Sequence, residues 1–125
     1  MKTIKQNHFI NASPEEVFSA ITNPVTIELW SGYPAHMEAK EDIEFSIFDG
    51  DISGRNISFI TNKQLVQEWY FGDSQNESIV TIELKAQHEG TRVILEHTNV
   101  PDEAAEEFEE GWSKYYWGAI NQFFK

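Results

Sequence analysis

The last stretch of the chain, residues 101–125, has the clearest hydrophobic pattern and predicts one long amphipathic helix. Its apolar and small residues recur at the helical period of about 3.6 residues. They therefore share one broad face, which comprises Ala105, Phe108, Gly111, Trp112, Tyr115, Tyr116, Gly118, Ala119 and Phe123. Pro101 ends the preceding strand, and Asp102 is an N-cap or first-turn acid at the positive end of the helix dipole. A face of this size needs a large partner surface, and a sheet would provide one.

Before residue 36, the pattern predicts a strand followed by two short helices. Residues 3–12 alternate as the first edge strand of a sheet should. The stretch SPEE at 13–16 is a helix start, because its serine suits the N-cap, its proline suits the first helical position and its second glutamate completes a capping box. The dipeptide Asn-Pro at 23–24 starts a second helix, which runs towards Trp30 and ends at the Ser-Gly pair at 31–32.

From residue 36 onwards the period becomes two, which predicts strands joined by short turns. The expected strands cover residues 36–40, 44–49, 54–61, 64–72, 78–87 and 91–100, and the expected turns lie at 49–51, 61–63, 72–76 and 88–90. Short connections imply antiparallel neighbours. Val80, Ile82 and Leu84 point to one face, whereas Thr81 and Glu83 point to the other. One apolar and one polar face indicate a sheet that is covered on one side.

These elements together predict an α+β fold in one domain, residues 1–125. We expect a curved antiparallel sheet of about six or seven strands, with two short helices after the first strand. The long C-terminal helix should pack on the concave, apolar face of that sheet.

Composition and charge restrict the classes of partner. Nine basic against 21 acidic side chains give a net charge of −12, which argues against nucleic acid as a partner because phosphate binding needs a basic surface. The acidity indicates either solubility alone or an acidic patch that binds a basic partner. Without cysteine, the chain can form no disulfide or thiolate site. No apolar run approaches the roughly 20 residues of a membrane span, and no signal-peptide pattern is present, so we expect a cytoplasmic protein with no membrane insertion.

Motifs for catalysis, metals and cofactors are missing from the sequence. The four histidines are isolated, and the chain has no HExxH, GxSxG, P-loop or GxGxxG motif. We therefore expect no metal, no cofactor and no enzymatic activity. His97 is the histidine of interest, because it follows Val93 and Leu95 on the inward face of a strand. Three roles stay open for it: a buried structural imidazole, a ligand contact, or an acid–base group.

Aromatic residues make up 14% of the chain, which indicates either a heavily aromatic core or a lined cavity. The residues that could line a cavity are Trp30, Tyr33, Phe45, Phe59, Trp69, His97, Trp112, Tyr115 and Tyr116. Aromatic walls with a few polar tips suit a lipophilic small molecule. We expect a cavity on the order of a few hundred Å³ that is bounded by Trp69, His97, Trp112 and Tyr116. Ordinary core packing is the alternative for each residue.

Two further pairs in the C-terminal helix leave alternatives open. Gly111 and Gly118 lie on the predicted inner face, where they either allow close packing on the sheet or leave room for a ligand. Trp117 and Phe124 fall on the opposite side of the helical wheel. There they either mark a protein contact or are covered by another segment.

Four groups of motifs, in their order along the chain, resemble a known superfamily. They are an opening strand followed by ASPEEVF at 12–18, Asn23-Pro24 leading to Trp30, GTRV at 90–93 followed by LEH at 95–97, and Val100-Pro101 followed by Gly111-Trp112 and an aromatic-rich helix end. With these motifs the chain resembles the START-like (SRPBCC, helix-grip) superfamily, which includes the birch-pollen allergen and steroid-transport domains. Within it, the chain is most similar to the Activator of Hsp90 ATPase homologue 1-like branch.

The resemblance implies several possible functions. The first is the binding of a small hydrophobic or amphipathic ligand, such as a lipid, between the sheet and the C-terminal helix. The second is a cochaperone-like interaction with Hsp90 or another protein partner, through the acidic start of that helix or the surface around Trp117. A cyclase- or hydrolase-like enzyme is the third, because some relatives have such activities.

Overall fold

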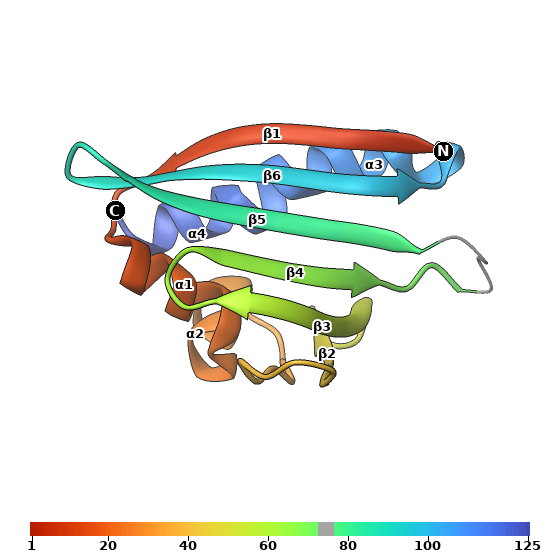
Figure 1. Cartoon of the computed structure of the whole chain (residues 1–125), viewed down its shortest axis with the longest axis horizontal. Coiled ribbons are helices and arrows are strands. Elements are labelled where there is room, and N and C mark those ends of the chain that lie inside the picture. The colour runs from red at the N-terminus through yellow and green to blue at the C-terminus, as the bar shows by residue number, and fades with distance from the viewer. Residues whose placement is uncertain (73–76) are drawn as a thin grey trace.

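The computed structural model describes residues 1–72 and 77–125. Its elements follow the predicted order (Figure 1). They are β1 (Lys2–Ile10), α1 (Pro14–Thr22), α2 (Pro24–Ser31), β2 (Glu44–Ile47), β3 (Ile52–Ile60), β4 (Gln64–Trp69), β5 (Ser78–Gln87), β6 (Gly90–Val100), α3 (Asp102–Gly111), the π-helical segment η1 (Trp112–Trp117) and α4 (Gly118–Phe123). The α+β architecture with a C-terminal helix on an antiparallel sheet is therefore confirmed.

The sheet has six strands in the order β1-β6-β5-β4-β3-β2, and every neighbouring pair is antiparallel. The meander from β2 to β6 agrees with the short turns. A seventh strand, predicted at 36–40, is wrong: this stretch makes a single bridge, between His36 and Ser46. The chain turns at Asp42, where φ is 62°, before β2 begins. Of the predicted turn at 72–76, residues 73–76 lie outside the described residues.

The two short helices begin where their caps predict. Ser13 Oγ accepts a hydrogen bond from the Glu16 amide at 3.2 Å, and the Glu16 carboxylate accepts one from the Ser13 amide, so the capping box is complete. The Asn23 side chain caps α2, and Gly32 ends it in the left-handed conformation with φ 81°. In the described part of the chain, no helix is both long and apolar enough to cross a membrane.

The face of the sheet that meets the helices follows the predicted alternation, apart from one bulge. Val80, Ile82 and Leu84 of β5 are buried, as predicted. In β3 the register shifts between Asn56 and Ser58, which places an extra residue in that strand. A bulge of this kind reverses the alternation beyond it. The strand therefore turns Asn56 inward before the shift and Phe59, which lies opposite Leu65, inward after it.

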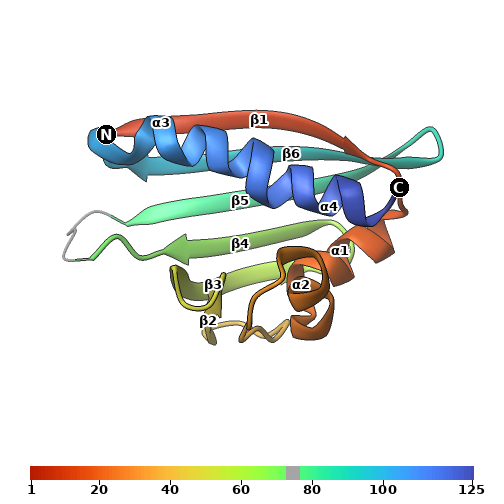
Figure 2. The ribbon, with the colours of Figure 1, turned by 180° about the vertical axis from the view of Figure 1, so that it is seen from behind.

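The C-terminal helix crosses the face of the sheet that also carries α1 and α2 (Figure 2). The helix runs without a break through α3, η1 and α4, but the segment η1 in its middle is π-helical. A π turn closes i→i+5 hydrogen bonds and so holds more residues than an α turn. Residues beyond it are consequently rotated from the positions that a regular helical wheel assigns.

This rotation corrects three of the predicted positions. Tyr115 and Phe123, which the regular wheel places on the buried face, are exposed. Trp117, which that wheel places on the opposite side, is fully buried and stacks on His8 of β1. Of the two alternatives for Trp117, cover by another segment is therefore right.

Of the two helix glycines, Gly118 has a cause that differs from both expected ones. A Cβ on Gly118 would lie 2.7 Å from the carbonyl oxygen of Ser113, in the preceding turn of the same helix. Gly118 is therefore required by the helix backbone next to the π turn, not by packing on the sheet or by a ligand. A Cβ on Gly111 would meet no atom within 4 Å, so close packing does not explain that glycine.

The π turn predicts that Trp117 contributes more to stability than Tyr115, whereas a regular helix predicts the reverse. Trp117→Ala should lower the free energy of unfolding by about 3–5 kcal/mol, because it opens a large cavity in the core. Tyr115→Ala should change it by about 0.5 kcal/mol or less, because Tyr115 is 59% exposed. Urea denaturation of both variants measures the difference. A larger loss for Tyr115→Ala would contradict the π-helical arrangement.

Candidate functional site

The nine aromatic and histidine candidates lie in different environments. Trp69, His97, Trp112 and Tyr116 come together between the sheet and the C-terminal helix, and all four are buried. Trp30 and Phe45 are also buried, and Phe59 is half-buried beside Phe18. Tyr33 and Tyr115 are more than half exposed and join neither group.

The four residues between sheet and helix contact one another. The indole rings of Trp69 and Trp112 stack with their centroids 4.6 Å apart. Tyr116 lies 4.6 Å from Trp112, and the His97 ring lies edge-on to Trp69 at 5.1 Å. Phe108 of α3 closes the group from the other side, 6.2 Å from His97. These side chains themselves occupy the space that a ligand between sheet and helix would need.

His97 uses both of its ring nitrogens. Trp112 Nε1 donates a hydrogen bond to His97 Nδ1 at 3.0 Å, so Nδ1 carries no proton. The proton therefore sits on Nε2, which donates to Ser78 Oγ at 2.8 Å, and Ser78 in turn donates to the carbonyl oxygen of Thr98. Burial lowers the pKa of His97 to about 4, which keeps the ring neutral. Of the three roles left open for His97, these contacts describe the structural one.

A chain of buried amide side chains runs across the same face of the sheet. Trp69 Nε1 donates to Gln67 Oε1 at 3.0 Å, and Gln67 Nε2 donates to Asn56 Oδ1 at 2.8 Å. Asn56 Nδ2 then donates to the carbonyl oxygen of Glu38 at 2.8 Å. The chain thereby ties the segment 37–40, which belongs to no strand, to the sheet. The sequence does carry a signal for it, because Gln67 stands between Leu65 and Trp69 at an inward position of β4.

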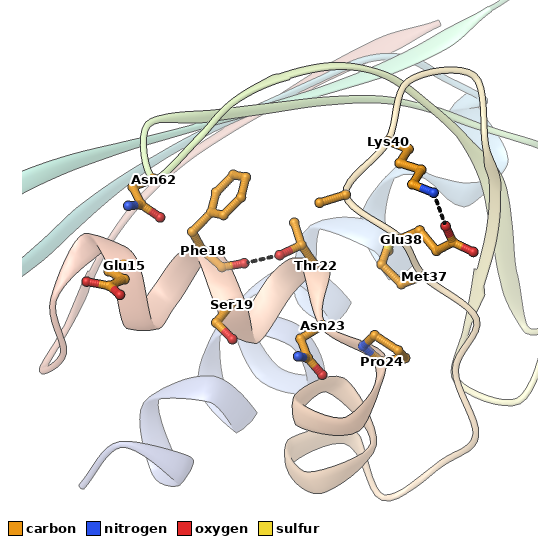
Figure 3. A pocket seen from close by; sticks show the side chains of 11 residues that line it. Glu15, Phe18, Ser19, Thr22, Asn23, Pro24, Met37, Glu38, Lys40 and Asn62 are labelled. Carbon is orange, nitrogen blue, oxygen red and sulfur yellow. Dashed lines mark hydrogen bonds and ion pairs between the residues drawn. The ribbon is translucent and has the colours of Figure 1, made fainter.

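A groove of about 490 Å³ opens between α1 and the segment 37–40, next to the turn that joins β3 to β4 (Figure 3). We call it the α1 groove. Its walls are formed by Glu15, Phe18, Ser19, Thr22, Asn23, Pro24, Met37, Glu38, Ala39, Lys40 and Asn62. None of the nine candidates lines it. Sequence reasoning missed it because three segments distant in the chain form it, and because its apolar residues have the pattern of ordinary core positions.

The α1 groove has an apolar floor and a polar rim. Phe18 and Met37 are largely buried at its base. Thr22 Oγ1 is engaged, since it donates to the Phe18 carbonyl oxygen at 2.7 Å. On the rim, Lys40 pairs with Glu38 at 3.5 Å (Figure 3). The groove can therefore receive an apolar group with polar atoms at its edge.

Comparison with known families places the whole fold in context. The model of the family described as Activator of Hsp90 ATPase homolog 1-like protein matches residues 11–125. The human Activator of 90 kDa heat shock protein ATPase homolog 1 is 28% identical over 114 residues, which are 90% of this chain and 34% of the human protein. The Dictyostelium discoideum Activator of 90 kDa heat shock protein ATPase homolog is 27% identical over 116 residues, 90% of this chain and 30% of its own length. The chain thus spans about a third of the length of these curated relatives.

Solved structures confirm the fold. A Plasmodium falciparum protein described as an HSP90 activator superposes with a TM-score of 0.90 at 24% identity, over 98% of this chain and 96% of that one. The Aha1 dimer from Colwellia psychrerythraea gives a TM-score of 0.87 at 16% identity, over 99% and 96% of the two chains. At these identities the likeness concerns the arrangement of the backbone.

The neutral, buried state of His97 predicts how stability depends on pH. The pKa of an unfolded histidine is near 6.5, so the unfolded chain takes up the proton before the folded one does. Stability is therefore complete above pH 6.5 and is lost as the pH falls towards 4, by about 3 kcal/mol in full and about 2 kcal/mol by pH 5. Urea denaturation at pH 7 and pH 5 measures this loss.

The matched variant for this measurement is His97→Gln, which should be less stable at pH 7 but should lack that part of the pH dependence. Burial also lowers the pKa of His8, which titrates in both proteins, so the comparison cancels its contribution. Equal losses of stability between pH 7 and pH 5 in the two proteins would contradict the assignment.

Removing the amide at position 56 should loosen the segment 37–40. Asn56→Ala removes the hydrogen bonds that the Asn56 side chain makes with Gln67 Nε2 and with the Glu38 carbonyl oxygen, so it should cost about 1–3 kcal/mol of unfolding free energy. Hydrogen exchange should become faster at the Asp42 amide, which bonds the backbone carbonyl of residue 56. Ser58→Ala, in the same strand, is the control and should change stability by about 0.5 kcal/mol or less. Unchanged exchange at Asp42 would argue against a tether.

Proposed function

The chain belongs to the Activator of Hsp90 ATPase homolog 1-like family, and from this premise we propose that it is a protein-interaction domain that binds an Hsp90-type chaperone and stimulates its ATP hydrolysis. The observation that carries the proposal is the family match over residues 11–125. The chaperone role enters as a proposal, because the human activator is matched over only 34% of its length.

The packing between sheet and helix supports a role at the surface. The region in which the lipophilic ligand was expected is taken up by the stacked indoles of Trp69 and Trp112 and by His97, whose two ring nitrogens are both hydrogen-bonded. A ligand there would have to displace buried aromatic rings and break the hydrogen bond from Trp112. Binding of a partner to the outside of the domain needs no such rearrangement.

Of the two contact surfaces that the sequence suggested, one stays accessible. Trp117 is buried and cannot meet a partner. The first half of the C-terminal helix is exposed and strongly acidic, with Asp102, Glu103, Glu106, Glu107, Glu109 and Glu110. Asp102 is engaged by the N-terminal amine at 2.8 Å, which leaves the glutamates. We propose that these glutamates meet a basic surface of the chaperone, where complementary charge would mainly raise the rate of association.

Small-molecule binding is the second candidate function, and the α1 groove is the observation that favours it. Its volume of about 490 Å³ falls in the range of ligand pockets. It lies away from the region between sheet and helix in which that function was first expected.

The chaperone proposal predicts that the purified domain increases the ATP hydrolysis rate of the Hsp90-type chaperone from the same organism. Glu106→Gln/Glu110→Gln, which removes two charges from one face of the helix, should weaken this effect by lowering the association rate. The effect should be greatest at low ionic strength, because salt screens exposed charges. A coupled ATPase assay across a salt series measures both.

The matched control is Glu83→Gln/Glu89→Gln, which removes the same charge from β5 and the turn after it. Equal activity of the two double variants would move the contact away from the helix. If the parent domain neither binds the chaperone nor changes its ATPase rate, the proposed function itself is wrong.

A further inference from the structure

The α1 groove has walls that are fixed before any ligand arrives. On one side, α1 begins with a complete capping box at Ser13 and Glu16. On the other, the segment 37–40 is held by the bond from Asn56 to the Glu38 carbonyl, and Asn56 is fully buried. A site with preset walls loses little conformational entropy when it binds a ligand.

The groove can cover the body of a small apolar molecule. Phe18 and Met37 lie at its base, and the ring of Pro24 and the methyl group of Ala39 complete the apolar lining. Phe59 packs behind Phe18, with ring centroids 6.4 Å apart, and so supports the floor from the sheet. A flat aromatic or short alkyl group fits such a lining.

The charges on the rim of the groove determine whether a cationic or an anionic group of a ligand is favoured there. Lys40 lies 3.5 Å from Glu38, so the charges of this exposed pair offset one another. Among the described residues, the Glu15 carboxylate forms no ion pair and stands on the opposite side of the groove (Figure 3). The three charged side chains of the rim sum to −1, in a chain whose net charge is −12. The groove therefore favours a cation over an anion.

We propose that the α1 groove is a binding site for a small amphipathic amine, whose apolar body lies on Phe18 and Met37 and whose ammonium group meets Glu15. Hydrogen-bonding groups of Ser19 and Asn62, which also line the groove, are in place for polar atoms along the ligand. This site is separate from the acidic glutamates of α3 and does not depend on the chaperone proposal.

Three indole probes that differ only in the end of the side chain test the proposal on the full chain. Tryptamine carries an ammonium group, tryptophol a neutral hydroxyl and indole-3-acetate a carboxylate. Titration of the ¹⁵N-labelled protein with tryptamine should give saturable amide shifts in residues 15–24, 37–40 and 62, with a Kd on the order of 1 mM for a ligand of this size. Tryptophol should bind about two- to fivefold more weakly, as expected for the loss of one exposed charge pair, and indole-3-acetate more weakly still.

Variants assign the ammonium contact and the groove separately. Glu15→Gln should remove the preference for tryptamine over tryptophol, whereas Glu103→Gln, which removes the same charge from α3, should keep it. Ser19→Trp should fill the groove and abolish the shifts. Ala39→Trp is the second blocking variant, because position 39 is exposed and tolerates a large side chain without disturbing the core.

Several results would overturn the proposal. Absence of saturable shifts in the groove residues, or persistence of the shifts in both folded tryptophan variants, would exclude the site. Equal affinity for tryptamine and tryptophol would exclude the ammonium contact. If tryptamine does not bind but Ser19→Trp abolishes stimulation of the chaperone, the groove receives a protein segment and the small-molecule inference is wrong.

Discussion

The hydrogen bond from Trp112 to His97 fixes the C-terminal helix on the sheet. It lies among stacked aromatic rings, and in such a low-dielectric setting a bond of 3.0 Å is strong and its loss is costly. The bond sets the rotation of the helix at residue 112. The π turn that starts there then rotates the next turn, so that Tyr116 and Trp117 both face inward. One polar contact and one irregular turn thus allow a single helix to bury three large aromatics, Trp112, Tyr116 and Trp117.

The elements that the sequence predicted correctly depend on local chemistry. Ser13 and Asn23 cap their helices with their own side chains. The alternation in β5 is also local, because successive side chains of a strand point to opposite faces of the sheet. The π turn and the β3 bulge at Asn56 were missed because each adds a residue to a regular period. A regular period applied to Trp117 therefore gave the wrong side of the helix.

Residue type alone was a poor guide to the candidate site. The aromatics were selected because rings can line a cavity, but the rings of Trp69 and Trp112 stack on each other. Gln67 stands at an inward position of β4, but the sequence does not indicate that it bonds Asn56, and these two buried amides hold the wall of the α1 groove. That groove is formed by segments that meet only through the tertiary fold, so no spacing along the chain could reveal it.

The aromatic cluster and the groove are nevertheless parts of one connected structure. Trp69 stacks on Trp112 and also donates to Gln67, from which the amide chain continues to the Glu38 carbonyl. The buried side chains thereby hold the helix and the segment 37–40 in place. A ligand or protein partner would then bind at the surface. Because acidic groups are in excess over the whole chain, charge alone would attract basic molecules with little selectivity. Selectivity among basic molecules must then come from the shape of the binding site. On the described surface, the α1 groove has such a shape, with an apolar floor and a charged rim.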